Sequence, residues 1–197
     1  MRTLLTFLAA LAATACHARA DAQPVAYTVD PAHTQVHWEV RHFGTSTSRG
    51  RFGSVDAAIV LDRAAHRGEL SVSIGTGGVD SGVGPLDAML RGSSFLAAAE
   101  FPSAYFVASQ LVFDGERLVE ARGEFTLRGV SRPLTLKALQ FGCRTDASTA
   151  REVCGGDFEA EFRRSAYGIT FGLPFVADTV RLQIQVEAVR RDTGPGG

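Results

Sequence analysis

The histidines are the side chains of this sequence whose type and spacing come nearest to a catalytic or metal-binding site. His33, His37 and His42 lie close together in the sequence, and His66 falls in a predicted turn. On an extended strand, His33 and His37 share a face but stand about 13 Å apart. The ligand bonds of a shared metal run near about 2 Å, and His42 points to the face opposite His37. We therefore expect surface or turn histidines and no metal or haem ligands.

Other catalytic patterns are equally poor in this sequence. Ser93-Ser94 lacks the G-x-S-x-G setting of a nucleophile elbow. The glycine-rich stretch 75–78 lacks the Lys-Ser/Thr pair and the long helix of a phosphate-binding loop. Acidic residues fall mostly in turns or on outward-facing strand positions. We expect no catalytic residues, no enzyme activity and no cofactor.

Cys143 and Cys154 are separated by ten residues. In an exported protein, such an even pair is typical of a structural disulfide. A redox or metal-binding pair is the alternative, but it would favour the tighter C-x-x-C spacing.

The N-terminal segment predicts export. Arg2 precedes an apolar stretch over residues 4–15, and Ala18-Arg19-Ala20 offers a signal-peptidase site before Asp21. The stretch is shorter than the roughly twenty residues that span a bilayer. We expect a signal peptide at 1–20 and a periplasmic protein, with a lipid anchor through Cys16 as the alternative.

The mature chain is mildly acidic. Removing residues 1–20 takes away Arg2 and Arg19, which changes the formal net charge from −1 to −3. Such a chain has no basic patch for nucleic acid or for an anionic membrane. Its length fits one domain with a substantial core.

The apolar residues recur at every second position along most of the chain. This period indicates strands with one apolar and one wet face. Seven runs show it clearly: 36–40, 55–61, 70–74, 119–127, 134–138, 158–162 and 180–186. Residues 62–68 and 114–116 have the composition of hairpin turns. The pattern favours an antiparallel barrel or sandwich.

One region departs from the two-residue period. Leu86, Met89 and Leu90 have helical spacing within residues 85–99, and Gly92 divides the segment, so we expect two short helices inserted between strands. We predict a single barrel domain over residues 21–190 and a disordered polar tail over 191–197.

Large aromatic and small residues alternate on the inward-facing positions. Phe106, Phe125, Phe158 and Phe162 share this face with glycines and alanines. Such a mixture could fill a packed core, or it could leave a lumen for one ligand in a barrel of about eight strands. The residues alone leave both alternatives open.

Four segments, taken in order, resemble the YceI-like family of exported, lipocalin-like, polyisoprenoid-binding proteins. They are YTVDPAHTQVHWEVRHFG, PLDAMLRGSSFLAAAEFPSAYF, GEFTLRGVSRPLTL and VADTVRLQIQVEA, which together run from Tyr27 toward Val189. The resemblance implies an eight-stranded antiparallel barrel with a helical insertion, enclosing an isoprenoid chain. One position departs from the family pattern: Ala166 stands where Arg-x-Asp-Phe-Gly would place an aspartate, which removes any polar role of that side chain.

From the resemblance and the inward parity we predict a lipid-binding tunnel. The candidate ligand-binding residues are Trp38, Val40, His42, Phe52, Phe95, Phe106, Phe125, Phe158 and Phe162. Residues 86–95 would cover one mouth, and His42 would contact the head of the ligand.

The resemblance implies a carrier or reservoir for a polyprenyl or quinone-like lipid. The alternatives are a redox accessory that presents a quinone to a membrane electron-transfer partner, and a ligand-free structural or stress-response barrel. A transient contact with the membrane or with a membrane redox protein would accompany either lipid-binding function. A homodimer is compatible with such a barrel, although no exposed apolar stripe marks an interface.

Overall fold

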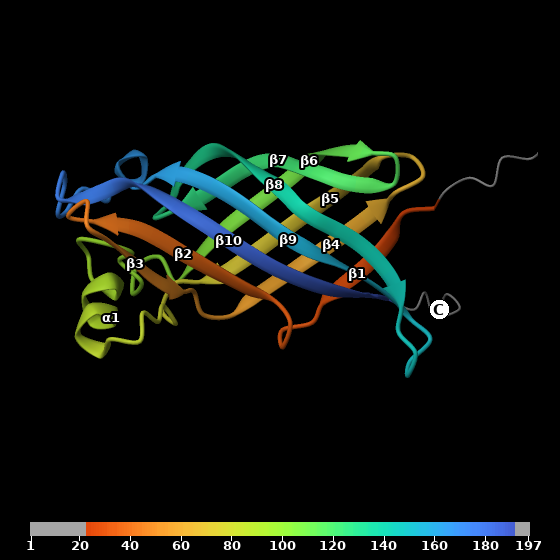
Figure 1. Cartoon of the computed structure of the whole chain (residues 1–197), viewed down its shortest axis with the longest axis horizontal. Coiled ribbons are helices and arrows are strands. Elements are labelled where there is room, and N and C mark those ends of the chain that lie inside the picture. The colour runs from red at the N-terminus through yellow and green to blue at the C-terminus, as the bar shows by residue number, and fades with distance from the viewer. Residues whose placement is uncertain (1–22, 192–197) are drawn as a thin grey trace, which may run out of the picture.

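The computed structural model describes residues 23–191 and contains one antiparallel sheet closed into a barrel (Figure 1). The expected signal peptide lies outside the described residues, as does the expected tail from residue 192. The strands are β1 (Val25–Val29), β2 (Gln35–His42), β3 (Ser46–Arg51), β4 (Val55–Asp62), β5 (Arg67–Gly75), β6 (Ser103–Asp114), β7 (Arg117–Leu127), β8 (Val130–Thr145), β9 (Glu152–Arg163) and β10 (Val176–Arg190). The helices are α1 (Gly84–Arg91) and the 3₁₀ turn η1 (Arg164–Tyr167).

The ten strands occupy eight positions around the barrel. β1 and β2 share one position end to end, and β3 and β4 share another. β10 pairs with β2 along residues 176–185 and with β1 along residues 188–190, so β1 and β2 lie end to end beside it. In the same way, β3 pairs with β2 and β4 pairs with β1. The predicted eight-stranded antiparallel barrel is therefore confirmed.

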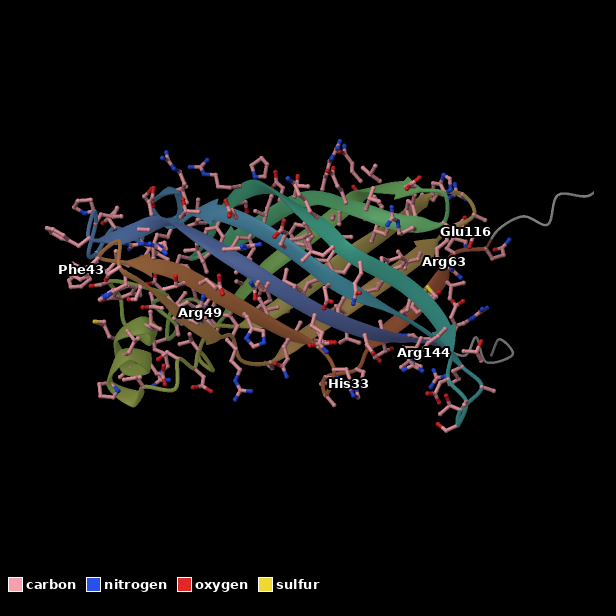
Figure 2. The ribbon with its side chains drawn as sticks, in the orientation of Figure 1. His33, Phe43, Arg49, Arg63, Glu116 and Arg144 are labelled. Carbon is pink, nitrogen blue, oxygen red and sulfur yellow. A yellow bond between two sulfur atoms is a disulfide. The ribbon has the colours of Figure 1, made fainter. Side chains whose placement is uncertain are left out.

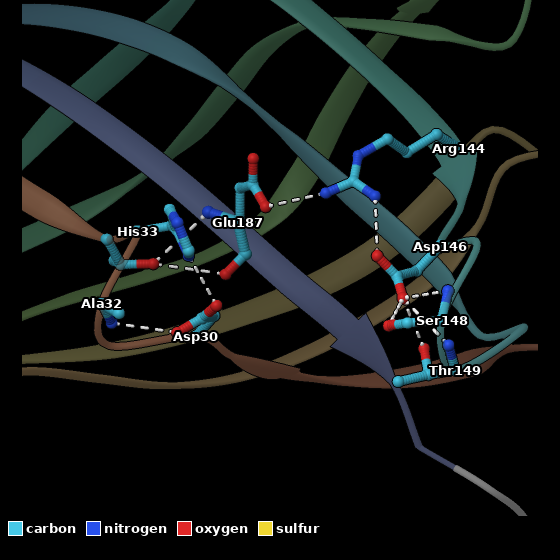
Figure 3. A network of polar contacts seen from close by, with 9 residues as sticks. Asp30, Ala32, His33, Arg144, Asp146, Ser148, Thr149 and Glu187 are labelled. Atoms are coloured by element: carbon cyan, nitrogen blue, oxygen red, sulfur yellow. Dashed lines mark hydrogen bonds and ion pairs between the residues drawn. The ribbon is translucent and has the colours of Figure 1, made fainter.

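Polar contacts hold the break between β1 and β2. The backbone N–H of Asp30 donates to the carbonyl oxygen of Glu187, and the hydroxyl of Thr34 donates to the same oxygen. In Figure 3, Arg144 of β8 reaches the carboxylate of Glu187 and that of Asp146. The break is thus tied to Glu187 of β10, whose side chain is in turn held by Arg144 of β8.

The predicted hairpins and most of the predicted inward-facing residues are present, but register shifts alter the alternation at four points, two of which lie in the middle of long strand pairs. One interrupts the pairing of β6 with β7 between Ala108 and Gln110, and the other interrupts β8 and β9 between Ala138 and Gln140. A bulge adds one residue to one strand and changes which face the next residues occupy. Without the bulge, the alternation through Leu136 and Ala138 would place Gln140 on the inner face; with it, Phe141 faces the interior instead.

The insertion between β5 and β6 contains one α-helix, not the two expected. α1 begins with Pro85 in its first turn and ends at Arg91, with Gly92 as its C-cap. Residues 93–100 form successive turns, stabilised by backbone bonds such as Leu96 N–H to the Leu90 carbonyl oxygen. Figure 1 places α1 at one end of the barrel, next to β3. No helix within residues 23–191 has the length and apolar character needed to cross a bilayer.

Candidate functional site

An apolar cavity of about 170 Å³ lies at the end of the barrel next to α1. We call it the mouth cavity. His42 and Met89 are among its lining residues and are exposed, so the cavity reaches the surface. The wall is completed by Trp38, Val40, Ser48, Phe52, Val79, Leu86, Leu90, Phe95, Leu96, Leu127, Phe162, Arg164, Ile169, Val176 and Val180.

A second cavity of about 110 Å³, the deep cavity, lies further along the barrel axis. All of its lining residues are buried or half-buried. Phe106, Phe125 and Phe158 contribute aromatic rings to it, and Ala57, Ala121 and Ala188 leave space opposite them. The wall is otherwise apolar, and its two hydroxyl-bearing residues are Thr34 and Tyr27.

Three aromatic rings stand between the two cavities. Phe125 lines the deep cavity and Phe162 the mouth cavity, and their ring centroids are 5.3 Å apart. Tyr167 of η1 contacts both, at 5.6 Å from Phe125 and 5.3 Å from Phe162. Known ligand pockets hold about 300–1,000 Å³. A long chain would therefore have to displace these rings and occupy both cavities.

The mouth cavity contains the guanidinium of Arg164, which is 4% exposed. Nε and Nη2 donate to the carbonyl oxygens of Ala177 and Val176, while Nη1 donates to those of Ile169 and Phe171. Burial lowers the pKa of Arg164, and the nearby Asp178 carboxylate opposes this effect. The arginine thus closes the 169–177 loop over the end of the barrel.

Asp178 fixes the start of η1 in the same region. Its carboxylate accepts hydrogen bonds from the backbone N–H of Ser165 at 2.8 Å and from the Ser165 hydroxyl at 2.7 Å. Burial acts to raise the pKa of Asp178, but these bonds and the charges of Arg163 and Arg164 hold it below its ordinary value. Asp178 is therefore ionised at neutral pH.

Trp38 carries a buried polar group without a partner. Its side chain is 7% exposed, and within residues 23–191 no acceptor lies within hydrogen-bonding distance of its indole Nε1. A buried donor left unpaired costs about 1–3 kcal/mol. Trp38 lines the mouth cavity, but its Nε1 has less than 1 Å² of accessible surface, so the unpaired N–H lies within the wall and does not face the open space.

At the opposite end of the barrel, polar side chains bond one another beside the deep cavity, and a disulfide joins two adjacent strands of the wall. The hydroxyl of Tyr27, at the wall of the deep cavity, donates to Glu152 at 2.5 Å, and Arg63 pairs with Glu152 at 2.9 Å. Burial raises the pKa of Tyr27 to about 12, and the bond to Glu152 acts in the same direction. Figure 2 shows Arg63 and Glu116 at this end and Phe43 at the other.

The predicted disulfide joins Cys143 of β8 to Cys154 of β9, whose Cα atoms are 4.0 Å apart. Cys143, Cys154 and Glu152 place their ligand-type atoms within 4.8 Å of one another. Because both sulfurs are bonded to each other, this group does not offer thiolates to a metal.

The rim of the mouth cavity exposes large apolar side chains. Phe43, Phe171 and Phe175 are 59%, 58% and 63% exposed. Phe43 stacks on Phe175 with ring centroids 5.6 Å apart, and Phe171 packs against Phe95 at 5.5 Å. We call Phe43, Phe171 and Phe175 the aromatic rim.

The structure places all nine predicted ligand-binding residues at cavity walls, in two groups. The mouth cavity is lined by Trp38, Val40, His42, Phe52, Phe95 and Phe162. The deep cavity is lined by Phe106, Phe125 and Phe158. His33 and His66 lie on neither wall: His33 pairs with Asp30 at 2.7 Å, and His66 stacks on Phe113. Ala166, at the position that departs from the family pattern, is exposed.

The sequence reasoning missed the structural roles of Arg164, Tyr167 and Asp178. Charged residues are almost never fully buried unless paired, so the alternation gave no reason to place an arginine in an apolar interior. A signal that could have found Arg164 and Tyr167 is the interval of residues 164–175 between β9 and β10, where two glycines and a proline interrupt the alternating pattern.

Comparison with known proteins agrees with this architecture. The model of the YceI-like domain family matches residues 27–188, which is most of the chain. The chain belongs to the YceI-like family. A UPF0312 protein of Shewanella denitrificans is 32% identical over 84% of this chain and 87% of its own length. Protein YceI of Salmonella arizonae is 30% identical over 81% of this chain and 83% of its own length.

Solved structures of other YceI-like and related proteins share the fold. Burkholderia cenocepacia BcnA superposes with a TM-score of 0.67 at 21% identity, covering 81% of this chain and 98% of BcnA. A domain from Saccharophagus degradans, described as a polyisoprenoid binding domain implicated in plant cell wall breakdown, gives a TM-score of 0.63 at 14% identity. It covers 85% of this chain and 99% of that domain.

Proposed function

We propose that this protein is an exported, non-catalytic carrier that holds one long isoprenoid lipid along the barrel axis. The tail would occupy the deep cavity, and the head would lie in the mouth cavity. The observation that carries this proposal is the uneven distribution of polar side chains along one apolar interior: His42, Ser48 and Arg164 line the mouth cavity, whereas the deep cavity is lined almost wholly by apolar residues.

The physics of binding suits a hydrocarbon chain. Each methylene removed from water contributes about 0.8 kcal/mol, so a polyprenyl tail binds tightly without polar contacts. A closed barrel satisfies its backbone hydrogen bonds within the wall and leaves the interior to apolar side chains. The polyisoprenoid-binding description of the Saccharophagus domain supports the same class of ligand.

Export and membrane contact form part of the proposal. The N-terminal sequence pattern and the Cys143–Cys154 disulfide favour an oxidising compartment such as the periplasm. A carrier for a bilayer lipid must load and unload at a membrane. The aromatic rim around the mouth cavity is a suitable contact surface, because amphipathic and aromatic side chains favour the membrane interface.

Two variants of β4 test the position of the tail. Ala57 is buried at the wall of the deep cavity, whereas its neighbour Ala58 is exposed on the outer face. Ala57→Leu adds three carbons to the cavity, and Ala58→Leu makes the same change outside it. Filling a site that a ligand must occupy should lower lipid occupancy by about tenfold, equivalent to ~1.4 kcal/mol.

The measurement is native mass spectrometry of protein purified from the cell envelope, followed by lipid extraction. Wild type and Ala58→Leu should carry one prenyl lipid per chain, and Ala57→Leu should be largely empty while melting at the temperature of delipidated wild type, because bound lipid itself raises the melting temperature. The intact mass also determines whether the mature chain begins at Asp21. An empty wild-type protein that also refused added isoprenoids would contradict the carrier function and favour the packed-core alternative.

A further inference from the structure

Two residues stand between the deep cavity and the surface at the end of the barrel where Arg63 lies (Figure 2). Tyr27 of β1 and Leu61 of β4 line the deep cavity, and both also line a surface pocket of about 200 Å³. Tyr27 is 2% exposed and Leu61 is 5% exposed, so their side chains are buried between the two spaces. We call this pair the floor of the deep cavity.

Tyr27 is fixed through both its backbone and its hydroxyl. Its backbone pairs with Ile59 of β4 on one side and with Arg190 of β10 on the other. Its hydroxyl donates to the carboxylate of Glu152, which also accepts a hydrogen bond from Arg63. The ring of Tyr27 therefore has little freedom to move aside when a tail reaches it.

Leu61 is positioned by a glycine on the neighbouring strand. Leu61 pairs with Gly68 of β5, and a Cβ at position 68 would stand 2.9 Å from Cδ2 of Leu61. The leucine thus packs over a position that has no side chain. The partition between the two cavities is different, because Tyr167 belongs to the 3₁₀ turn η1 and not to a paired strand.

The chemical character of the surroundings changes at the floor. On the inner side, Val29, Cys154 and Ala188 form one buried cluster with the floor residues. The outer pocket is lined by five charged side chains: Asp62, Arg63, Glu116, Glu152 and Arg190. Hydrocarbon gains free energy by moving from water into apolar surroundings, whereas burying charged groups under it costs their hydration. A tail is therefore stabilised as far as the floor and not beyond it.

We infer that Tyr27 and Leu61 set the upper limit of the tail length that the barrel accepts. This inference rests on the proposed carrier function and adds a selectivity to it. With the head in the mouth cavity and the end of the tail against the floor, the distance between them determines how many isoprene units fit. A longer tail would leave its excess carbons in water at the mouth.

A competition between tails of different lengths tests the floor. Delipidated protein is mixed with equal amounts of benzoquinones that share one head and differ only in the number of isoprene units, all dispersed in the same detergent micelles. Native mass spectrometry then identifies the bound tails. In wild type, the bound fraction should fall about tenfold or more for each unit beyond a limiting length, because a unit of about five carbons left in water loses its gain from burial.

Two variants should move this limit in opposite directions. Leu61→Ala opens the floor and should raise the limit by about one isoprene unit. Ala188→Leu adds a side chain just inside the floor and should lower the limit by about one unit. Val60→Ala and Ala58→Leu are the matched controls, because both residues belong to β4 and line neither cavity, and they should keep the wild-type limit.

Each variant is first checked for a wild-type near-ultraviolet circular dichroism spectrum. Because the two changes act in opposite directions, either one that folds decides the question. A limit that stays at the wild-type length in the folded variants would overturn the inference, as would a wild-type protein that shows no limit up to the longest tail. Failure of wild type to bind a tail of any length would overturn the proposed carrier function itself.

Discussion

The polar side chains of the barrel interior are gathered at its two ends, where they do different things. At the closed end, Tyr27, Glu152 and Arg63 satisfy one another. At the mouth, Arg164 is satisfied by backbone carbonyls, while the Trp38 N–H is left without an acceptor. His42 lies at the mouth and is exposed, so it can reach a ligand and water at once.

The effect of His42 on lipid binding should be small. A hydrogen bond made at an exposed position competes with water, so His42→Ala should weaken binding of an oxygen-bearing prenyl lipid by about threefold. A titration of lipid into apo-protein measures this. His37→Ala is the matched control, because His37 bonds Gln35 and does not line either cavity. Unchanged affinity in His42→Ala would mean that this histidine belongs only to the hairpin.

For individual residues, the inward positions of the cavity-lining aromatics could be predicted from the sequence, because successive strand residues point to alternate faces of the sheet. Phe106 and Phe125, for example, form a directly paired couple whose inward position follows from the alternation alone. Arg164 and Tyr167 could not be placed in this way, since they belong to a 3₁₀ turn and not to a strand.

Among the elements, β3 and the two bulges escaped the sequence patterns for related reasons. The residues of β3 are Ser, Thr, Arg and Gly, and its inward positions hold Ser48 and Gly50 opposite Val40 and Trp38. A strand whose inner face is small and polar shows no apolar alternation. A bulge, in turn, depends on hydrogen bonds between two strands, which a single strand's sequence does not reveal. The strands with strong alternation were the ones that could be predicted.

The 164–178 segment should loosen in acid. The pKa of Asp178 in the folded state lies below its ordinary value. Its carboxylate therefore stabilises the folded state fully at any pH above the ordinary pKa of an aspartate. As the pH falls through the folded pKa, the carboxylate is protonated and this contribution is lost. Thermal unfolding of wild type and Asp178→Asn should therefore differ at pH 7, and the difference should shrink below about pH 4. A difference that stayed constant down to pH 3 would contradict the assigned role of Asp178.

For the molecule as a whole, the aromatic rim and two arginines share the mouth end. Arg41 is exposed on β2 and donates to the Gly44 carbonyl oxygen, and Arg91 is exposed at the end of α1. Neither makes an ion pair with any carboxylate in the part of the chain described by the structure. The exposed aromatic rings would suit the membrane interface, and the two arginines add a local attraction to anionic headgroups, although the mildly acidic chain has no larger basic patch.

Vesicle binding tests this surface. The double variant Phe43→Ser/Phe175→Ser should lose most of its sedimentation with vesicles that contain anionic lipid, because each exposed phenylalanine buries apolar area in the interface. Leu139→Ser is the matched control, since Leu139 is equally exposed but lies on β8, away from the rim. Equal loss in the control, or no loss in the double variant, would contradict a membrane contact through the rim.

The closed end of the barrel has a consequence for the kinetics of lipid exchange. Because Tyr27, Glu152 and Arg63 form a hydrogen-bonded cluster at one end, the cargo of the proposed carrier would enter and leave through the mouth cavity alone. An incoming lipid then cannot push the bound one out from behind. Exchange becomes a sequence of departure followed by entry, so its rate is fixed by how fast the first lipid leaves, however abundant the second. Such a carrier would retain its lipid even when other lipids are abundant, and its exchange rate would equal the dissociation rate of the bound lipid.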